Sequence, residues 1–254
     1  MKKLLITLGL LVGMSSSAVM AAGAVDLPFK ADIDQTDKAS LQRGAKLFMN
    51  YCLGCHQAQF QRYERTFNDL GIPLDLGMEN LVFTRDTKVG DHIKNAMPQA
   101  DAAKWFGAPP PDLTLEARLR GPDWIYSYLK TFYVDPSRPF GVNNTVFKDV
   151  GMPHVLQELQ GVPTKKEVFE EQLIDGELKK VSLGVQYVDD GSGELSEDEY
   201  DRAVLDITNF MVYIGEPMIL ERESIGYKAL IYCFIFFVLA VLLKKEFWRD
   251  VKKK

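Results

Sequence analysis

The chain has 254 residues and a formal net charge of -5, with 46% hydrophobic and 26% charged residues. These values are ordinary for a folded protein, and the length suits one domain with a sizeable core plus appendages, or two small domains. Because the body of the chain carries no basic stripe, we expect no nucleic-acid partner.

The N-terminus, "MKKLLITLGLLVGMSSSAVMAAGA", has the three parts of a secretory signal peptide. Two lysines come first, an apolar run follows from Leu4 to Val12, and small residues complete the segment. We expect residues 1–22 to be a signal peptide, with cleavage after one of the alanines between positions 21 and 24. An uncleaved anchor helix fits less well, because serines and alanines follow Gly13.

A helix is predicted next by "SLQRGAKLFMNY", whose apolar residues share one face, and it leads directly into "CLGCH". A redox pair at Cys52 and Cys55 would instead follow a strand. Zinc would need two more ligands, and the sequence has no second Cys-x-x-Cys and no His-x-x-x-His. Two thiols on one helical turn can add to the two vinyl groups of a haem, and His56 then faces the iron. The motif therefore predicts one covalently bound haem c, with His56 as the proximal ligand.

Several downstream side chains could fill the second axial position: His92, Met97, Met152, His154, Met211 and Met218. Met97 and Met152 are each followed by proline, which stiffens a ligand loop. Gly151 also lets the backbone approach a haem closely. We therefore favour Met152 and keep Met97 and His154 as alternatives. A methionine ligand raises the haem potential, which favours a high-potential electron relay.

The segment "LTLEARLRGPDWIYSYLKTFY" reads as two helices broken at Gly121, and "SRPFGVNNTVFKDVGMP" reads as a loop. The stretch "KKEVFEEQLIDGELKKVSLGVQYVDDGSGEL" predicts a small hairpin around its glycines. Ser196 and Glu199 form a capping box that starts a helix containing Asp206 to Ile214. The domain should therefore be mainly α with long loops.

The C-terminal segment from Ala229 to Leu243 carries no charge and is followed by "KKEFWRDVKKK". We expect a transmembrane anchor at residues 224–244 and a basic cytoplasmic tail at 245–254. Residues 23–223 would then form the exported haem domain. The sole remaining cysteine, Cys233, lies within the apolar segment.

Four segments together resemble the cytochrome c1 family, the membrane-anchored haem subunits of ubiquinol–cytochrome c oxidoreductase (the bc1 complex). They are the segment around "CLGCH" with the following "RYER", "APPPDLTLEARLRGPDWIYSYL", "VGMPHVL", and the last helix ending in "GEP". The resemblance implies a class I cytochrome c-like haem domain. It also implies that Arg120 pairs with a haem propionate and that Pro110 and Pro111 pack along the haem edge. The ligand loop departs from the family's pattern at His154, where a proline is common.

The resemblance further implies an electron-transfer subunit of a bacterial inner membrane, with its haem domain in the periplasm and no catalysis on its own. Its partners would be cytochrome b, a Rieske iron–sulfur protein as electron donor and a cytochrome c as acceptor. Acidic residues between Glu158 and Asp201 read as a solvated face, or as a surface that steers a basic cytochrome c. One rival function is a free-standing anchored cytochrome c that feeds a terminal oxidase. Another is a peroxidase-like enzyme or sensor with an open haem site.

Overall fold

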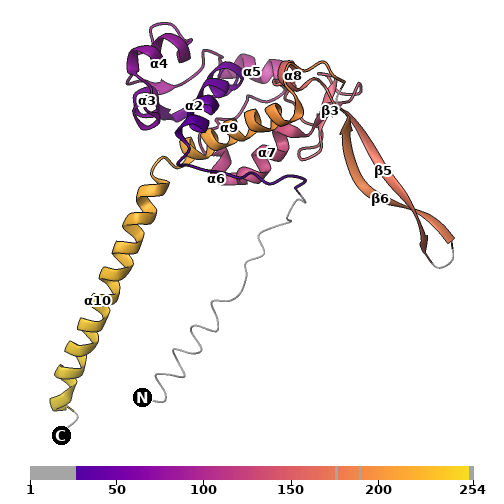
Figure 1. Ribbon diagram of the computed structural model, residues 1–254. Coiled ribbons are helices and arrows are strands. Elements are labelled where there is room, and N and C mark those ends of the chain that lie inside the picture. Colours follow the sequence, from indigo (N-terminus) through magenta and orange to yellow (C-terminus); the bar gives the residue numbers. More distant parts are fainter. Residues whose placement is uncertain (1–26, 175–176, 189, 252–254) are drawn as a thin grey trace.

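The computed structural model describes residues 27–174, 177–188 and 190–251, so the expected signal peptide lies outside the described residues. The described part is mainly helical, as Figure 1 shows. It also carries three two-stranded sheets. The elements in chain order are α2 (Lys38–Leu47), the π-helical turn η2 (Phe48–Cys52), β1 (Ala58–Arg62), α3 (Tyr63–Leu70), α4 (Leu74–Leu81), β2 (His92–Ile93), α5 (Gln99–Phe106), α6 (Glu116–Arg120), α7 (Pro122–Lys130), β3 (Phe132–Val134), β4 (Val142–Asn144), α8 (Gln157–Gln160), β5 (Thr164–Ile174), β6 (Glu177–Val188), α9 (Glu197–Gly215) and α10 (Ile219–Val251). The predicted mainly α fold is confirmed.

The core is built where α2 packs on α9, the two helices crossing in the centre of the body (Figure 1). Gly44 makes the close approach possible, because a Cβ at this position would press on the Asp206 carbonyl oxygen and lie 2.8 Å from the Cβ of Phe210. Beside this contact, the Arg43 guanidinium donates to both carboxylate oxygens of Asp206, at 2.6 and 2.9 Å. The rings of Phe48 and Phe210 pack against each other, with 5.4 Å between their centroids. The end of α2 is thereby fixed firmly to the core.

The predicted break between two helices is confirmed at Gly121, which has φ 88° and separates α6 from α7. Pro122 then occupies the first turn of α7, where a missing N–H costs nothing. The expected loop between α7 and the methionine candidate at 152 is more ordered than predicted. It contains β4, which pairs antiparallel with β3.

The predicted hairpin is confirmed and is longer than expected. Strands β5 and β6 pair antiparallel from Thr164↔Val188 to Ile174↔Glu177, and they project away from the body (Figure 1). Gly176, one of the two glycines around which the hairpin is predicted, lies outside the described residues. The other, Gly184, takes φ 115° next to an irregularity in the strand pairing.

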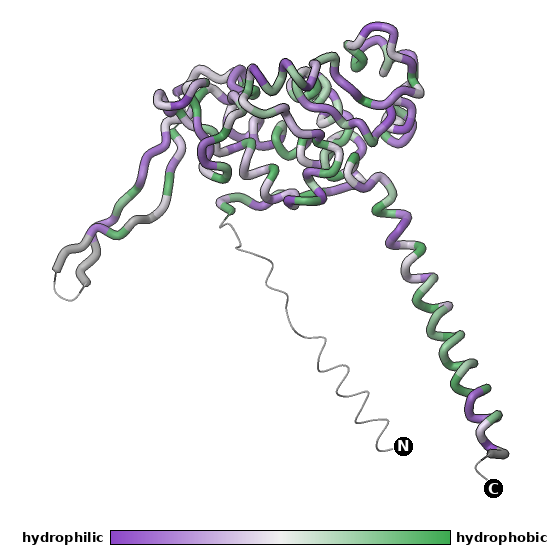
Figure 2. Tube along the Cα trace, turned by 180° about the vertical axis from the view of Figure 1, so that it is seen from behind, coloured by the Kyte–Doolittle hydropathy of each residue, from purple (hydrophilic) through white to green (hydrophobic). Residues whose placement is uncertain are grey.

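The last helix, α10, leaves the body as a long rod, and its middle is a continuous hydrophobic stretch (Figure 2). Within Ile219–Arg249, the most apolar stretch of 18 residues has a mean hydropathy of 2.3, and none of it is buried against the domain. This helix is long and apolar enough to span a membrane. Glu216, at the end of α9, pairs with Arg222 of α10 at 2.9 Å and with Arg118 at 3.7 Å. These ion pairs connect the domain to the start of the anchor helix.

Candidate haem-binding site

A cavity of about 360 Å³ opens between the Cys-x-x-Cys-His turn and the segment after β4. Its walls come from η2 and the turn after it, the end of α5, the proline-rich segment before α6, α6 itself, α7, the loop after β4, and α9. The lining includes Cys52, Cys55, His56, Pro110, Pro111, Arg120, Trp124, Tyr128, Phe147, Met152 and Met211. The two cysteines of the motif, His56, the favoured Met152, Arg120 and the two prolines therefore all lie on this one cavity.

The proximal wall is a single tight turn. The backbone N–H groups of Cys55 and His56 both donate to the carbonyl oxygen of Cys52, at 3.1 and 2.9 Å. Both cysteines are free, and burial raises the pKa of the Cys52 thiol to about 12 and raises the pKa of Cys55. Neither thiol is therefore an activated thiolate of the kind a redox pair uses.

His56 is oriented by the proline-rich segment. Its Nδ1 donates a hydrogen bond to the carbonyl oxygen of Pro111 at 2.7 Å, because a carbonyl can only accept. This fixes the tautomer and leaves Nε2 with the lone pair that a metal ligand needs. Burial lowers the pKa of His56, which keeps the ring in the neutral, ligating form. The segment is held in place by Asp112, whose carboxylate accepts from the backbone N–H of Gln59 at 2.8 Å.

The six candidates for the second axial ligand lie in different parts of the structure, and two of them line the cavity. Met152 lies on the cavity wall, as does Met211, which is buried on α9. Met97 lies instead in a second hollow together with Trp105, away from His56. His154 does not line the cavity, because its buried ring is stacked on Phe132 at 4.9 Å.

The remaining two candidates take part in other contacts. His92 lies on β2 and pairs with Arg62 of β1 across the small sheet. The sulfur of Met218 accepts a hydrogen bond from the Arg65 guanidinium at 2.9 Å. Neither lines the cavity, so Met152 and Met211 are the two candidates on its wall, and Met152 remains the ligand expected from the sequence.

Arg120 places a positive charge at the cavity. Its guanidinium lies over the Trp124 ring at 4.3 Å, and Nε donates to Glu116 at 2.8 Å. Arg118, by contrast, faces away and pairs with Glu216. Arg120 is therefore the arginine of this pair placed to meet an anionic group in the cavity.

The contact between Tyr128 and Met152 was not predicted from the sequence. The Tyr128 hydroxyl donates to the Met152 sulfur at 3.3 Å, and burial raises the pKa of the phenol, so it remains a donor. The ring is stacked on Trp124 at 5.0 Å and meets the edge of Phe132 at 5.2 Å. A spacing of four residues on α7 could have placed these aromatics on one face, but it does not reveal the contact with residue 152.

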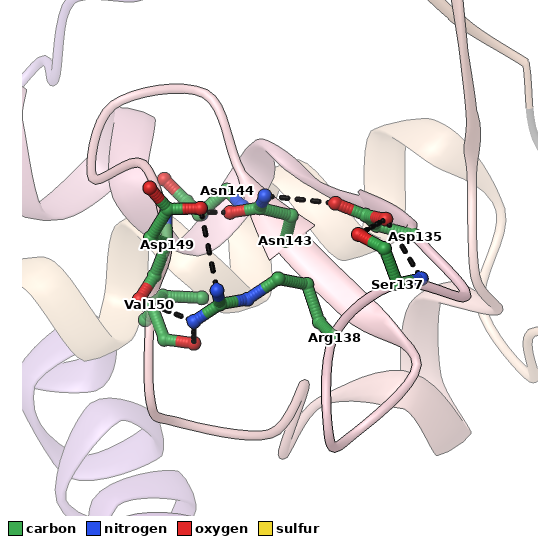
Figure 3. Close-up of polar contacts among 7 residues, drawn as sticks. All are labelled: Asp135, Ser137, Arg138, Asn143, Asn144, Asp149 and Val150. Carbon is green, nitrogen blue, oxygen red and sulfur yellow. Dashed lines mark hydrogen bonds and ion pairs between the residues drawn. The ribbon is translucent and has the colours of Figure 1, made fainter.

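The loop that carries Met152 is braced by a polar network, shown in Figure 3. Asn143 accepts from the Asp149 N–H at 2.9 Å and donates to Asp135 at 2.9 Å. The Arg138 guanidinium donates to the Asp149 carbonyl oxygen at 2.7 Å and to the carbonyl oxygen of Val150 at 3.4 Å. The backbone just before Met152 is thereby held from both sides.

Asn144 ties the same loop to α7. Its side-chain oxygen accepts from the N–H groups of Val146 and Phe147, at 2.9 and 3.0 Å. Its amide nitrogen donates to the carbonyl oxygen of Tyr128 at 2.7 Å. Asn144 is almost fully buried, so these bonds have no competition from water.

Together these residues fit a haem c. Two free thiols on one turn face an apolar cavity, a neutral imidazole with a fixed tautomer stands beside them, and a thioether lies on the same cavity. Within the described residues, no group of three or more His, Cys, Asp or Glu side chains could hold a metal ion. A tetrahedral zinc site therefore has no ligand set in this part of the chain.

Residues 27–251 match a family model described as the Cytochrome C1 family. The chain belongs to the cytochrome c1 family. A cytochrome c1 of Allochromatium vinosum is 50% identical over 251 residues, which cover 99% of this chain and 100% of the relative. The cytochrome c1 of Rhodospirillum rubrum is 27% identical over 276 residues, which cover 99% of this chain and 98% of the relative. A protein described as the ammonia monooxygenase gamma subunit of Nitrosomonas europaea is 45% identical over 222 residues, which cover 87% of this chain and 88% of the relative.

Membership in the cytochrome c1 family confirms the resemblance read from the sequence and implies a haem c. It also agrees with the long apolar α10, since cytochrome c1 is a membrane-anchored subunit. The fold prediction, a helical haem domain with one C-terminal membrane helix, is confirmed.

Proposed function

We propose that this chain is the haem electron-transfer subunit of a bc1 complex, with one haem c joined to Cys52 and Cys55 and held by His56 and Met152. The observation that carries the proposal is the shared cavity. It brings together the Cys-x-x-Cys-His turn and the Gly-Met-Pro loop, which lie far apart in a chain that matches the cytochrome c1 family along its length.

The chain's own residues would each have a defined role. A bound haem supplies a reversible one-electron couple. Cys52 and Cys55 bind the group permanently, and the Pro111 carbonyl orients His56. Arg120 offers a guanidinium to a propionate, while Pro110 and Pro111 pack against the edge of the ring and exclude water. A thioether at Met152 favours the reduced iron and so raises the potential.

No side chain at this cavity needs to be a general acid or base. The domain would accept an electron from a Rieske iron–sulfur protein and pass it to a cytochrome c, while quinol oxidation takes place on cytochrome b. We infer that the haem domain lies in the periplasm of a bacterial inner membrane. The single helix α10 would anchor it, with the basic tail in the cytoplasm.

Purification of the tagged full-length chain in mild detergent tests the assembly. We expect a b-type haem spectrum and a Rieske iron–sulfur signal in the same fraction, together with quinol–cytochrome c reductase activity. A free-standing anchored cytochrome, the alternative function, would purify with its c-type haem alone.

The covalent link is tested by denaturing electrophoresis with a haem stain. We expect the wild type and Cys233→Ala to retain the stain and a Cys52→Ala/Cys55→Ala variant to lose it. Cys233 is the matched control, because it lies on α10 outside the cavity. Retention of the stain by the double variant would contradict attachment at these cysteines.

A further inference from the structure

We propose that Tyr128 is a positioning residue that sets the potential of the site through its hydrogen bond to the Met152 sulfur. The inference rests on the proposed function, in which Met152 is an axial ligand. It concerns a residue that lies within one of the segments that resemble the family but to which the resemblance gave no role.

The first step is that the Tyr128 ring has little freedom to turn away. One face is stacked on Trp124 with only 9° between the ring planes, and the ring meets Phe132 edge-on at 73°. Trp124 is covered in turn by the Arg120 guanidinium. These ring contacts stabilise the orientation in which the hydroxyl donates to the Met152 sulfur.

The second step is that the spacing between donor and acceptor is fixed by one buried amide. Asn144 donates to the backbone carbonyl oxygen of Tyr128 and accepts from two N–H groups of the loop that leads to Met152. The helix that carries the donor and the loop that carries the acceptor are thus held by the same side chain. The Tyr128 hydroxyl oxygen lies 3.3 Å from the Met152 sulfur, between these two connected segments.

The third step is chemical. A thioether sulfur has two lone pairs, so it can bind a metal and accept a weak hydrogen bond together. A donor at the second lone pair withdraws electron density from sulfur, which weakens its donation to the more positive, oxidised iron. The hydrogen bond should therefore favour reduction. Because the bond to sulfur is weak and only its difference between the two redox states counts, we expect a change at the low end for a hydrogen bond, about threefold in the equilibrium constant. For a one-electron couple this corresponds to about 30 mV.

The test is a redox titration of the detergent-extracted complex with Tyr128→Phe, which removes the hydroxyl and keeps the aromatic stacking. We expect a retained thioether-to-iron charge-transfer band and a potential lower than wild type by the amount above. Tyr200→Phe is the matched control. Its buried hydroxyl also donates to α7, to the Leu129 carbonyl oxygen at 2.9 Å, but it does not line the cavity. It should lose stability without a shift in potential.

The inference is overturned if Tyr128→Phe titrates at the wild-type potential, or if Tyr200→Phe shifts the potential equally. Met152→Leu separates this failure from failure of the proposed function. If that variant keeps the charge-transfer band, the axial assignment itself is wrong. If it loses the band while Tyr128→Phe leaves the potential unchanged, Met152 is the ligand and only the role of Tyr128 is refuted.

Discussion

The two walls of the cavity are built in different ways. The proximal wall is one continuous stretch in which α2 passes through a π-helical turn into the Cys-x-x-Cys-His motif, and α9 supports it from behind. The distal wall is a loop whose position depends on side chains from β4, from α7 and from the turn between β3 and β4. Asn143, Asn144 and Arg138 hold it by hydrogen bonds to backbone groups.

The proximal wall would therefore attach the haem, whereas the distal wall would set its potential. A covalent link needs two thiols and an imidazole at fixed local spacing, which one helical turn provides. The axial sulfur needs a position relative to that turn, and only tertiary contacts can provide it. Damage to α2 should therefore affect the whole domain, whereas damage to the polar network should affect the distal ligand first.

The largest loss in the free energy of unfolding is expected from Gly44→Ala, which disturbs the contact between α2 and α9 behind the proximal wall. The new Cβ would press on the Asp206 carbonyl oxygen and on Phe210, and a backbone neighbour cannot move aside cheaply. Overpacking of this kind costs about 3 kcal/mol or more where backbone must shift. Denaturant unfolding of the extracted protein measures the cost.

Gly54→Ala is the control for that change, since it adds the same methyl group inside the Cys-x-x-Cys motif, where no atom lies within 4 Å of the new Cβ. Its free energy of unfolding should stay close to wild type. An equal loss in both variants would mean that the close approach of α2 and α9 is not what supports the proximal wall.

A smaller and more local effect is expected from Asn144→Ala. The change leaves the N–H groups of Val146 and Phe147 and the Tyr128 carbonyl oxygen without their partner. Each buried group left unpaired costs about 1–3 kcal/mol. The charge-transfer band should weaken before the domain unfolds, while the haem stain persists.

Asn50→Ala serves as the comparison for Asn144, because its exposed side chain bonds only to the Lys46 carbonyl oxygen. It should leave the band unchanged. If Asn144→Ala unfolds the whole domain with no separate loss of the band, the two walls are not independent.

The smallest effect is expected at the start of α9. Ser196→Ala removes a capping residue and should cost about 1 kcal/mol, with no change at either wall. The Glu199 carboxylate accepts from the Ser196 hydroxyl and N–H, and these bonds lower the pKa of Glu199 in the folded state. Its contribution to stability is therefore present above the ordinary pKa of a glutamate and is lost as the pH falls through the lowered value. Urea titrations from pH 7 to pH 3 should show the wild type losing its advantage over Ser196→Ala at the acid end.

The sequence predicted the parts of this molecule that depend on local rules. The Cys-x-x-Cys-His spacing, the break at Gly121, the capping box at Ser196 and the apolar C-terminal helix each follow from residues close together in the chain. The structure also places Met152, favoured for its glycine and proline neighbours, on the cavity that the Cys-x-x-Cys-His turn lines. The strand β4, predicted as loop, forms because it pairs with β3 across a turn, a contact that composition does not encode.

Tyr128 and Asn144 show why the rest could not be predicted. Tyr128 lies in "WIYSYLK", where it reads as one more core aromatic, and Asn144 lies in "GVNNTV", where asparagine reads as a turn residue. Their roles come from partners 24 and 16 residues away that meet only in the fold. Helical spacing can assign a face, but it cannot say which loop lies against that face.

The axial assignment is tested most directly by absorption spectra and redox titration of the membrane-extracted protein as wild type, Met152→Leu and Met97→Leu. We predict a reduced α-band in all three. The thioether-to-iron charge-transfer band should persist in the oxidised wild type and Met97→Leu, and it should vanish in Met152→Leu together with a large fall in potential. A band that survives in Met152→Leu and disappears in Met97→Leu would contradict the shared cavity as the haem site.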